Sequence, residues 1–336
     1  MNKALIIFAA FLLFQVETLF SQLVFSSNNE HARAMHSFED TLFLGTNLGN
    51  VYALTMDSLS KELHLKLVAK TTYLEIRDIE KLRNQDVIYM QTGEESSMNQ
   101  LYSHGRNIFK DSLNQNSNIF LDGFAFDGKV GFLMGDPIND KFSLFVSEDY
   151  GQSWNKLKDL KSYDGEAAFA ASGSTVYNKS NKFIFVSGGH KARFFISKNK
   201  GESWRDFELP IELCESCGIN SMVIVKRFFF KKRIVLVGGD FRRPNNQNDV
   251  CIYSDNWGST WKKSKIQPTG YRSKIVFNQK DKTLYSGGIN GIDISCDFGK
   301  TWKNLNEYSC YNMEFLDETL VVSSKTGFIH LIETKN

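Results

Sequence analysis

Seven polar residues stand at comparable places along the chain, each followed by a short stretch rich in apolar residues. They comprise three cations, two carboxylates and two amides: Arg33, Arg77, Asp122, Glu166, Asn220, Arg272 and Asn312. A guanidinium group can pair with a carboxylate through two parallel hydrogen bonds, so the three arginines predict a site for a carboxylate or another anion. The alternative is that the seven side chains pair with one another and with water, because unpaired polar groups are costly to desolvate.

A second group of candidates follows glycine residues. Asp136, His190 and Asp240 each come directly after a glycine that ends a β-rich run. A carboxyl group in a dry cleft can act as a general acid or base when its pKa is shifted. An aspartate after a turn glycine can also cap the backbone of its own loop, and we favour this interpretation for both aspartates. His190 is interpreted as an ordinary surface or hydrogen-bonded histidine.

The elements that position these residues are marked by a turn motif that occurs four times, Ser-x-Asp/Asn-x-Gly-x-Ser/Thr-Trp. Its Asp or Asn can accept backbone N–H groups of its own turn, its Gly supplies a positive φ, and its Trp packs between neighbouring units. The residues concerned are Asp149, Asn199, Asn256 and Asp297, with Trp154, Trp204, Trp261 and Trp302. The motif resembles the Asp-box, or BNR, repeat of propellers related to sialidases and sortilin-type domains.

The spacing of the repeats predicts the architecture. The four tryptophans are 50, 57 and 41 residues apart, which is the range expected for four-stranded propeller blades. Seven units are expected, with second strands at Thr41–Gly45, Val87–Gly93, Gly131–Gly135, Lys182–Gly189, Arg233–Gly239, Thr283–Gly288 and Thr319–Ser323. We therefore predict an all-β, seven-bladed β-propeller that forms a single domain over residues 22–336. The segment Leu23–Ser27 is expected to supply the last outer strand and close the ring, which removes free sheet edges.

Four further stretches resemble exported bacterial propellers similar to the photosystem II stability and assembly factor family. They are LDGFAF…GDPI (121–138), GEAAFAASGS (165–174), VGGDFRRP (237–244) and YRSKIVF (271–277). In photosynthetic members of that family the fold acts as an assembly scaffold, which holds a membrane-protein precursor against an arginine-bearing face. The resemblance implies a propeller that binds a partner on one face and leaves the partner unspecified.

The N-terminus predicts export. Lys3 is followed by the apolar run Ala4–Phe14 and then by a small residue, Ser21. This is the layout of a secretory signal peptide over residues 1–21, with cleavage after Ser21 and a secreted or periplasmic location. The alternative, a transmembrane anchor, needs a longer apolar run of about 20 residues. No transmembrane segment is expected after cleavage.

Charge and cysteine content restrict the remaining possibilities. The formal net charge of +2 gives no general indication of nucleic-acid binding. The basic run Lys226–Arg233 is interpreted as a solvated hairpin between two half-buried strands. Cys214 and Cys217 are a candidate disulfide, because a redox role would need a helix N-terminus that the sequence does not predict. We expect no metal and no cofactor.

Two classes of function fit these observations. The favoured one is a non-catalytic, monomeric scaffold that binds a protein segment or a small anionic ligand at the mouth of the channel. The alternative is a sialidase-like glycoside hydrolase acting on a carboxylated sugar, with Arg33, Arg77 and Arg272 as the carboxylate clamp. A hydrolase would also need a carboxylate within reach of a nucleophile, and no spacing in the sequence ties such a pair together.

Overall fold

The fold is known from a computed structural model of the chain. The structure describes residues 21–26, 30–57, 59–70, 75–84, 86–91, 100–103, 106–107, 119–169, 172–227, 231–325 and 327–333. Residues 1–20 of the predicted signal peptide lie outside these ranges. Every regular element in the described ranges is a β-strand, which confirms the all-β prediction. In the same ranges no helix is long and apolar enough to cross a membrane.

The strands form antiparallel sheets, which are numbered here in chain order. Sheet 1 contains β2 (Ala32–Phe38), β3 (Thr41–Thr46), β4 (Asn50–Met56) and β5 (Leu63–Lys70). Sheet 2 contains β6 (Ile76–Lys81), β7 (Val87–Gln91), β8 (Gln100–Ser103) and β9 (Arg106–Asn107). Sheet 3 contains β10 (Leu121–Asp127), β11 (Val130–Ile138), β12 (Lys141–Ser147) and β13 (Asn155–Lys156).

The second half of the chain continues the series. Sheet 4 contains β15 (Val176–Lys179), β16 (Lys182–Val186), β18 (Arg193–Ser197) and β19 (Arg205–Glu208). Sheet 5 contains β20 (Cys217–Lys226), β21 (Lys232–Asp240), β22 (Cys251–Ser254) and β23 (Lys262–Lys263). Sheet 6 contains β24 (Lys274–Asn278), β25 (Thr283–Gly288), β26 (Gly291–Ser295) and β27 (Lys303–Asn306). Sheet 7 contains β28 (Asn312–Leu316), β29 (Thr319–Ser323), β30 (Phe328–Glu333) and β1 (Ser21–Ser26).

The predicted strand Lys182–Gly189 is wrong in one respect, because the chain divides it into two strands. After β16 the backbone leaves sheet 4 at Ser187, and β17 (Gly188–Gly189) joins the inner edge of sheet 5 instead. There β17 pairs with β14 (Glu166–Ala167) on one side and with β20 on the other. The two glycines permit this close approach, since a Cβ at Gly188 would collide with the backbone of Gly218.

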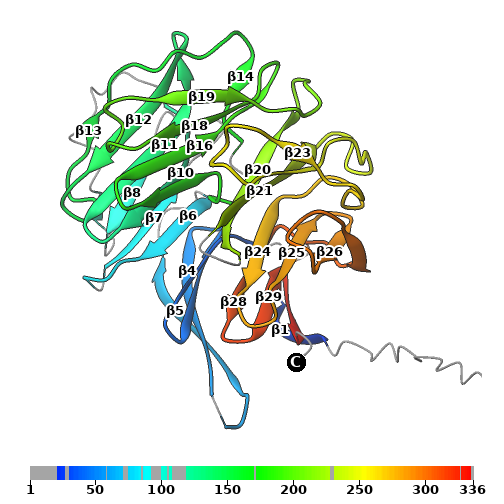
Figure 1. Cartoon of the computed structure of the whole chain (residues 1–336). Helices are drawn as coiled ribbons and strands as arrows, with labels where there is room; N and C mark the ends of the chain where they lie inside the picture. Colours follow the sequence, from blue (N-terminus) through cyan, green and yellow to red (C-terminus); the bar gives the residue numbers. More distant parts are fainter. Residues whose placement is uncertain are drawn as a thin grey trace, which may run out of the picture.

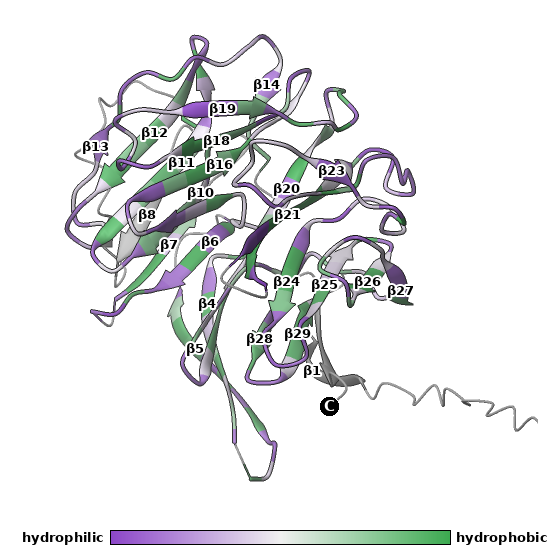
Figure 2. Ribbon diagram, in the orientation of Figure 1, coloured by the Kyte–Doolittle hydropathy of each residue, from purple (hydrophilic) through white to green (hydrophobic). Residues whose placement is uncertain are grey.

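The sheets follow one another around the molecule from the blue end of the chain to the red end (Figure 1). The hydrophobic stretches lie mainly along the inner and middle strands, whereas short outer strands such as β19 and β27 are hydrophilic (Figure 2). Buried side chains of adjacent sheets form shared cores. Phe132 of sheet 3, for example, stacks on Phe183 of sheet 4 with ring centroids 4.6 Å apart. Aromatic pairs of this kind stabilise the contact beyond the area that they bury.

The four motif turns have the predicted geometry. In the first turn Asp149 Oδ1 accepts the N–H of Ser153 at 2.9 Å, and Gly151 has a φ of 81°. The first serine of the motif also has a role, because Ser147 Oγ accepts the N–H of Gly151 at 2.8 Å. The other three turns repeat this bond from Gly201, Gly258 and Gly299. Each turn is therefore locked by its own side chains, and the following tryptophan is placed against the neighbouring sheet.

Candidate ligand-binding face

The candidate residues of the inner strands share an unusual backbone position. In sheets 1, 2, 3 and 5 the pairing of the first two strands shifts by one residue near the start of the inner strand. The residues skipped by these shifts are Arg33, Arg77, Asp122 and Asn220. A β-bulge re-aims the side chain of its extra residue out of the regular alternation. The four bulges lie at the same level of four sheets, where Arg33 and Arg77 are partly open to solvent and Asp122 and Asn220 are buried.

The two arginines among these bulge residues meet at a single carboxylate. Arg33 Nε lies 3.1 Å from Glu75 Oε1, and Arg77 Nε lies 2.7 Å from Glu75 Oε2. Glu75 thus bridges the inner strands of sheets 1 and 2. The side chains of Arg33, Arg77 and Glu75 keep 28%, 13% and 19% of their accessible surface, so the trio is partly open to solvent. It carries one net positive charge, the sum of two guanidinium groups and one carboxylate.

Aromatic residues and a histidine border this trio. The guanidinium of Arg33 lies 4.7 Å from the ring centre of Tyr311 in the approach to sheet 7, and that of Arg77 lies 5.9 Å from the ring centre of Phe120. His31 contacts the edge of Tyr311 with ring centroids 5.0 Å apart. Burial lowers the pKa of His31 below its usual 6.5, and the positive charges of the two arginines act in the same direction. This imidazole is therefore neutral near pH 7. We call His31, Arg33, Glu75, Arg77 and Tyr311 the arginine face.

A pair of buried carboxyl groups lies beside the arginine face in sheet 3. Burial raises the pKa of Asp122 well above its usual range, and the charge of Asp136 adds to this shift while Arg77 opposes it. Burial also raises the pKa of Asp136 to about 6, although its carboxylate accepts the N–H of Ala168 at 2.9 Å. Among the described residues, Asp122 Oδ2 has no hydrogen-bond partner. Asp136 can therefore hold or release a proton at moderately acid pH.

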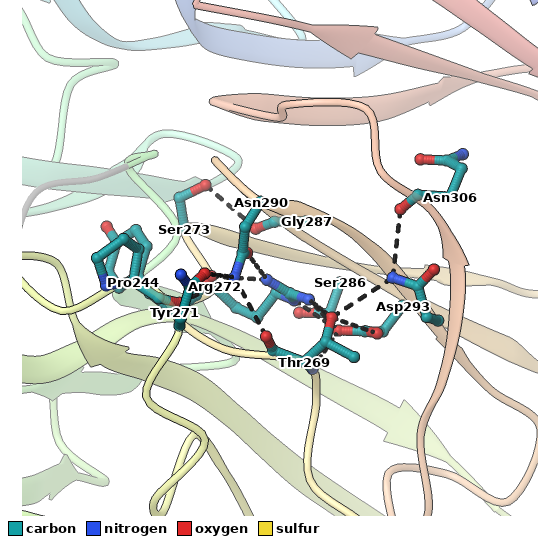
Figure 3. Close-up of polar contacts among 12 residues, drawn as sticks. Pro244, Thr269, Tyr271, Arg272, Ser273, Ser286, Gly287, Asn290, Asp293 and Asn306 are labelled. Carbon is teal, nitrogen blue, oxygen red and sulfur yellow. Dashed lines mark hydrogen bonds and ion pairs between the residues drawn. The ribbon is translucent and has the colours of Figure 1, made fainter.

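The contacts of Arg272 differ from those of the other two arginines, because they are made with residues in and beside sheet 6 (Figure 3). Its side chain is fully buried and forms an ion pair with Asp293, in which Nε donates at 2.7 Å. Other donors of the guanidinium reach Thr269 Oγ1, Asn290 Oδ1 and the carbonyl of Tyr271, at 2.6, 2.6 and 2.8 Å. The predicted clamp of three arginines is therefore not assembled, because Arg272 is occupied within the core of one sheet.

Glu166 is also occupied by a buried partner. Arg193 donates from Nη2 to Glu166 Oε2 at 2.6 Å and from Nε to Glu166 Oε1 at 2.9 Å, a two-bonded pair. Ser187 Oγ donates to the same carboxylate at 2.6 Å. This pair holds β14 against the strand break at Ser187, and we assign it a structural role.

The remaining candidates make local contacts. Asn220 Nδ2 donates to the carbonyl of Gly218 at 3.2 Å, and Asn312 donates to the carbonyl of Arg33. The second contact ties sheet 7 to the backbone of the arginine face. His190 is exposed, and its backbone N–H donates to the carbonyl of Gly165 at 2.8 Å.

Asp240 caps its own loop, as the favoured interpretation proposed. Its Oδ1 accepts the hydroxyl of Ser216 at 2.7 Å and the N–H of Arg242 at 2.9 Å, and its Oδ2 accepts from Arg243 Nε at 2.5 Å. Burial opposes ionisation of Asp240, but these hydrogen bonds outweigh it and lower its pKa. Cys214 and Cys217 form a disulfide in the same loop. Their sulfur atoms and Asp240 are close enough to hold a metal, yet the disulfide removes the thiolates that would bind it.

The space between the inner strands is filled on one side by the segment that follows β14. Ser172 Oγ donates to the carbonyl of Ser273 in the approach to sheet 6 at 2.9 Å, and Ser174 Oγ contacts Ser221 Oγ of sheet 5 at 2.6 Å. Gly173 packs against Asp78 of sheet 2, where any Cβ would collide with the carboxylate. One segment thus contacts sheets 2, 5 and 6. This arrangement favours a ligand site at the mouth, beside the arginine face, over one deep between the sheets.

Sequence reasoning missed Glu75, His31 and Tyr311. A signal for two of them was present, because His31 precedes Arg33 by two residues and Glu75 precedes Arg77 by two. Side chains two residues apart in an extended segment lie on one side of it, so this spacing could have indicated a shared face. Tyr311 carries no such signal, since its contact with Arg33 joins the two ends of the chain.

The antiparallel sheets, the locked turns and the inner-strand site define a β-propeller of the Asp-box kind. A family model for Sortilin-Vps10 (sortilin, neurotensin receptor 3) matches residues 142–285, which is less than half of the chain. The matched part contains the first three motif turns. A search of curated protein sequences found no match.

Solved structures support the same fold. A structure of YCF48 bound to a D1 peptide is similar over 96% of both chains, with a TM-score of 0.58 and 10% identity. The computationally designed Ika8 protein gives a TM-score of 0.56 at 10% identity, over 91% of this chain and 97% of its own. The Niastella koreensis GH74 enzyme gives 0.50 at 14% identity, over 91% of this chain and 42% of the enzyme. At these identities the likeness establishes the β-propeller fold alone.

Proposed function

We propose that this protein is an exported, non-catalytic scaffold that binds a protein segment or a small anionic ligand on the arginine face. The observation that carries the proposal is the bridge in which Glu75 joins Arg33 and Arg77 across two sheets. The trio has a net charge of +1, counted as two arginines minus one glutamate, and it is only partly buried. An anionic group of a partner gains attraction from this charge and can compete with Glu75 for the guanidinium donors.

The likeness to a propeller that was solved with a peptide supports a protein segment as the partner. The aromatic rings of Tyr311 and Phe120 beside the arginines add apolar area that a peptide side chain can cover. We further propose that the protein acts as a secreted or periplasmic monomer after removal of residues 1–21.

We also infer that the seven sheets are the seven blades of one ring. The pairing of β1 with β30, in which Gln22 lies opposite Leu331 and Ser26 opposite Phe328, would close that ring after cleavage. Closure in this manner fixes sheet 7 beside sheet 1 and so holds Tyr311 against Arg33. Deletion of residues 22–26 is therefore expected to loosen the arginine face as well as the ring.

The test is site-specific photo-cross-linking in the native host. A photoreactive residue replaces His31, which belongs to the arginine face. A second version carries it at Leu59, which is 93% exposed and is not part of that face. Cross-linked segments are identified by mass spectrometry. The His31 version is then combined with Arg33→Gln/Arg77→Gln, or with the matched control Arg205→Gln/Lys262→Gln on the outer strands β19 and β23.

We expect one defined protein segment to be cross-linked from position 31, lost with the arginine variant and kept with the outer-strand control. The proposal fails if position 31 captures no more than position 59. It also fails if the arginine variant, shown to be folded by its unfolding transition, captures the same segment with equal yield.

A hydrolytic function is the second candidate, and the carboxyl pair Asp122 and Asp136 is the observation that favours it. Their raised pKa values suit a general acid, and Arg77 lies close enough to influence the pKa of Asp122. Only Arg33 and Arg77 remain for a carboxylate clamp. Turnover of sialyl or uronyl glycosides that disappears in Asp136→Asn would support this function, and its absence together with peptide capture would reject it.

A further inference from the structure

A lysine patch occupies the end of sheets 4 and 5 that is opposite to the arginine face. In the hairpin of sheet 4, Lys179 lies directly opposite Lys182, and in the hairpin of sheet 5, Lys226 lies directly opposite Lys232. Like charges placed opposite each other on paired strands destabilise a sheet. Two such pairs on adjacent sheets are therefore unfavourable unless an anionic partner compensates them.

The ring of Trp257 joins the two lysine pairs. Lys182 Nζ lies 5.3 Å from its ring centre and Lys232 Nζ lies 5.1 Å from it, so one indole holds an ammonium group from each sheet. Trp257 belongs to the third motif turn and has a φ of 59°, a conformation that the locked turn imposes. The lysines are close enough to affect one another: burial lowers the pKa of Lys232, and the charges of Lys182, Lys179 and Lys226 lower it further.

The acidic groups near this patch are already engaged. Asp255 forms ion pairs with Arg227 and Arg233, at 2.9 and 2.8 Å. Asp127 accepts the N–H of Ser180 at 2.7 Å. Within the described part of the chain, none of the four lysines forms an ion pair with a carboxylate. Among the described residues, the patch thus presents four ammonium groups outside any ion pair, together with a half-buried tryptophan.

The sequence of the sheet 5 hairpin indicates which anion fits. Five residues, 227–231, connect β20 to β21, and in the sequence the middle three are phenylalanine. These three lie outside the described residues. Lysine together with tryptophan and phenylalanine is the composition of segments that bind the interface of an anionic bilayer. A nucleic acid would need a free aromatic face for base stacking, whereas the ring of Trp257 already has two ammonium groups beside it.

We propose that Lys179, Lys182, Lys226 and Lys232 with Trp257 form a docking site for an anionic phospholipid surface. The sequence analysis interpreted the basic run as a solvated hairpin, and this proposal gives two of its lysines a binding role in addition. The lysine patch lies where the inner strands β15 and β20 end, whereas the arginine face lies where inner strands begin. A molecule docked through the lysine patch therefore directs its arginine face away from the lipid.

The test is co-sedimentation of the purified protein with vesicles of phosphatidylglycerol and phosphatidylcholine, with pure phosphatidylcholine vesicles as the neutral control. The N-terminus of each preparation is determined by mass spectrometry, so that all variants are compared with the same N-terminus. The patch variant is Lys226→Gln/Lys232→Gln. The matched control, Lys262→Gln/Lys303→Gln, removes the same charge from exposed positions on the outer strands β23 and β27.

We expect binding to the anionic vesicles alone, and a salt-dependent affinity. Each lysine at an anionic surface contributes about a factor of five, so the patch variant should bind roughly 30-fold more weakly. The control variant should bind like the wild type. Equal binding to neutral vesicles, an equal loss in the control variant, or no vesicle binding overturns the proposal. Binding of single-stranded DNA without vesicle binding would also overturn it and assign the patch to nucleic acid.

The lipid proposal and the scaffold proposal can be refuted independently of each other. The patch variant keeps the arginine face, so its photo-cross-linking from position 31 should be unchanged in detergent-free solution. Conversely, Arg33→Gln/Arg77→Gln should keep wild-type vesicle binding. A loss of both activities in either variant would indicate a folding defect, which the unfolding transition detects.

Discussion

Arg33 and Arg77 occupy the same backbone position in two neighbouring sheets, each as the extra residue of a β-bulge near the start of an inner strand. A regular strand would send alternate side chains to the two packed faces, where an arginine needs a buried partner. The bulge releases the extra residue from this alternation, so its side chain can stand at the mouth while its neighbours, Ala32 and Ala34 in sheet 1, stay buried. The repeated bulge is thus a backbone device that creates a polar rim on an apolar fold.

Arg272, unlike Arg33 and Arg77, is fully buried with its carboxylate partner. Its substitution should therefore strongly destabilise the protein. Arg272→Met leaves Asp293 buried without its cation, and we expect a loss of about 3–5 kcal/mol in the free energy of unfolding. Urea denaturation measures this loss. The double variant Arg272→Met/Asp293→Leu should regain most of it, because no charge remains buried. Arg242→Met breaks the exposed pair with Glu215 and should cost less than about 1 kcal/mol. A double variant no more stable than the single one would contradict this account.

Replacing a motif glycine by alanine should destabilise the protein more than the same change at a glycine that also has a positive φ but has free space around its Cα. Gly258 has a φ of 84°, and a Cβ there would collide with the ring of Phe194 in the neighbouring sheet. Gly128 has a φ of 62°, and a Cβ there would meet no atom within 4 Å. Gly128→Ala should therefore cost about 1 kcal/mol from backbone strain alone. Gly258→Ala should cost about 2–4 kcal/mol, since overpacking is added to the strain. Thermal unfolding of the two variants checks the difference, and equal losses would refute the packing argument.

Ionisation of the buried Asp136 carboxyl group should lower the free energy of unfolding as the pH rises. Its folded pKa of about 6 is above the usual 3.8, so the folded state binds more protons than the unfolded state between these values. The stabilisation is therefore present at low pH and is lost as the pH rises through this window. Asp136→Asn keeps an oxygen that can accept the N–H of Ala168 and removes the ionisation.

The measurement is urea unfolding at pH values of about 4, 6 and 8. Asp136→Asn should match the wild type near pH 4 and exceed it by roughly 2 kcal/mol near pH 8. Asp140→Asn is the matched control, because Asp140 is exposed in the adjacent turn and already has a φ of 59°. A control with the same gain at high pH would mean that the effect arises from net charge rather than from burial.

How far the sequence predicts this molecule depends on how local the determining contacts are. The motif turns could be predicted because Ser147 bonds to both Asp149 and Gly151 within five residues. The disulfide is local for the same reason. The pairing of Arg272 with Asp293 and of Glu166 with Arg193 spans 21 and 27 residues, and no spacing in the sequence marks it. The partners of Arg272 and Glu166 could therefore not be named from the sequence, because they lie on strands that are distant along the chain.

The cysteines should report both the disulfide and the burial of the remaining thiols. Of the five cysteines, Cys214 and Cys217 are bonded, Cys296 is exposed, and Cys251 and Cys310 are buried. Burial raises the pKa of both buried thiols to about 12, which suppresses the reactive thiolate. A thiol-reactive dye should therefore label one group in the native protein, three in denaturant without reductant, and five after reduction. Three fast-reacting thiols in the native protein would contradict the packing of sheets 5 and 6. Labelling of five thiols in denaturant without reductant would show that Cys214 and Cys217 are not joined by a disulfide. The two free thiols beside Asp240 could then bind a metal.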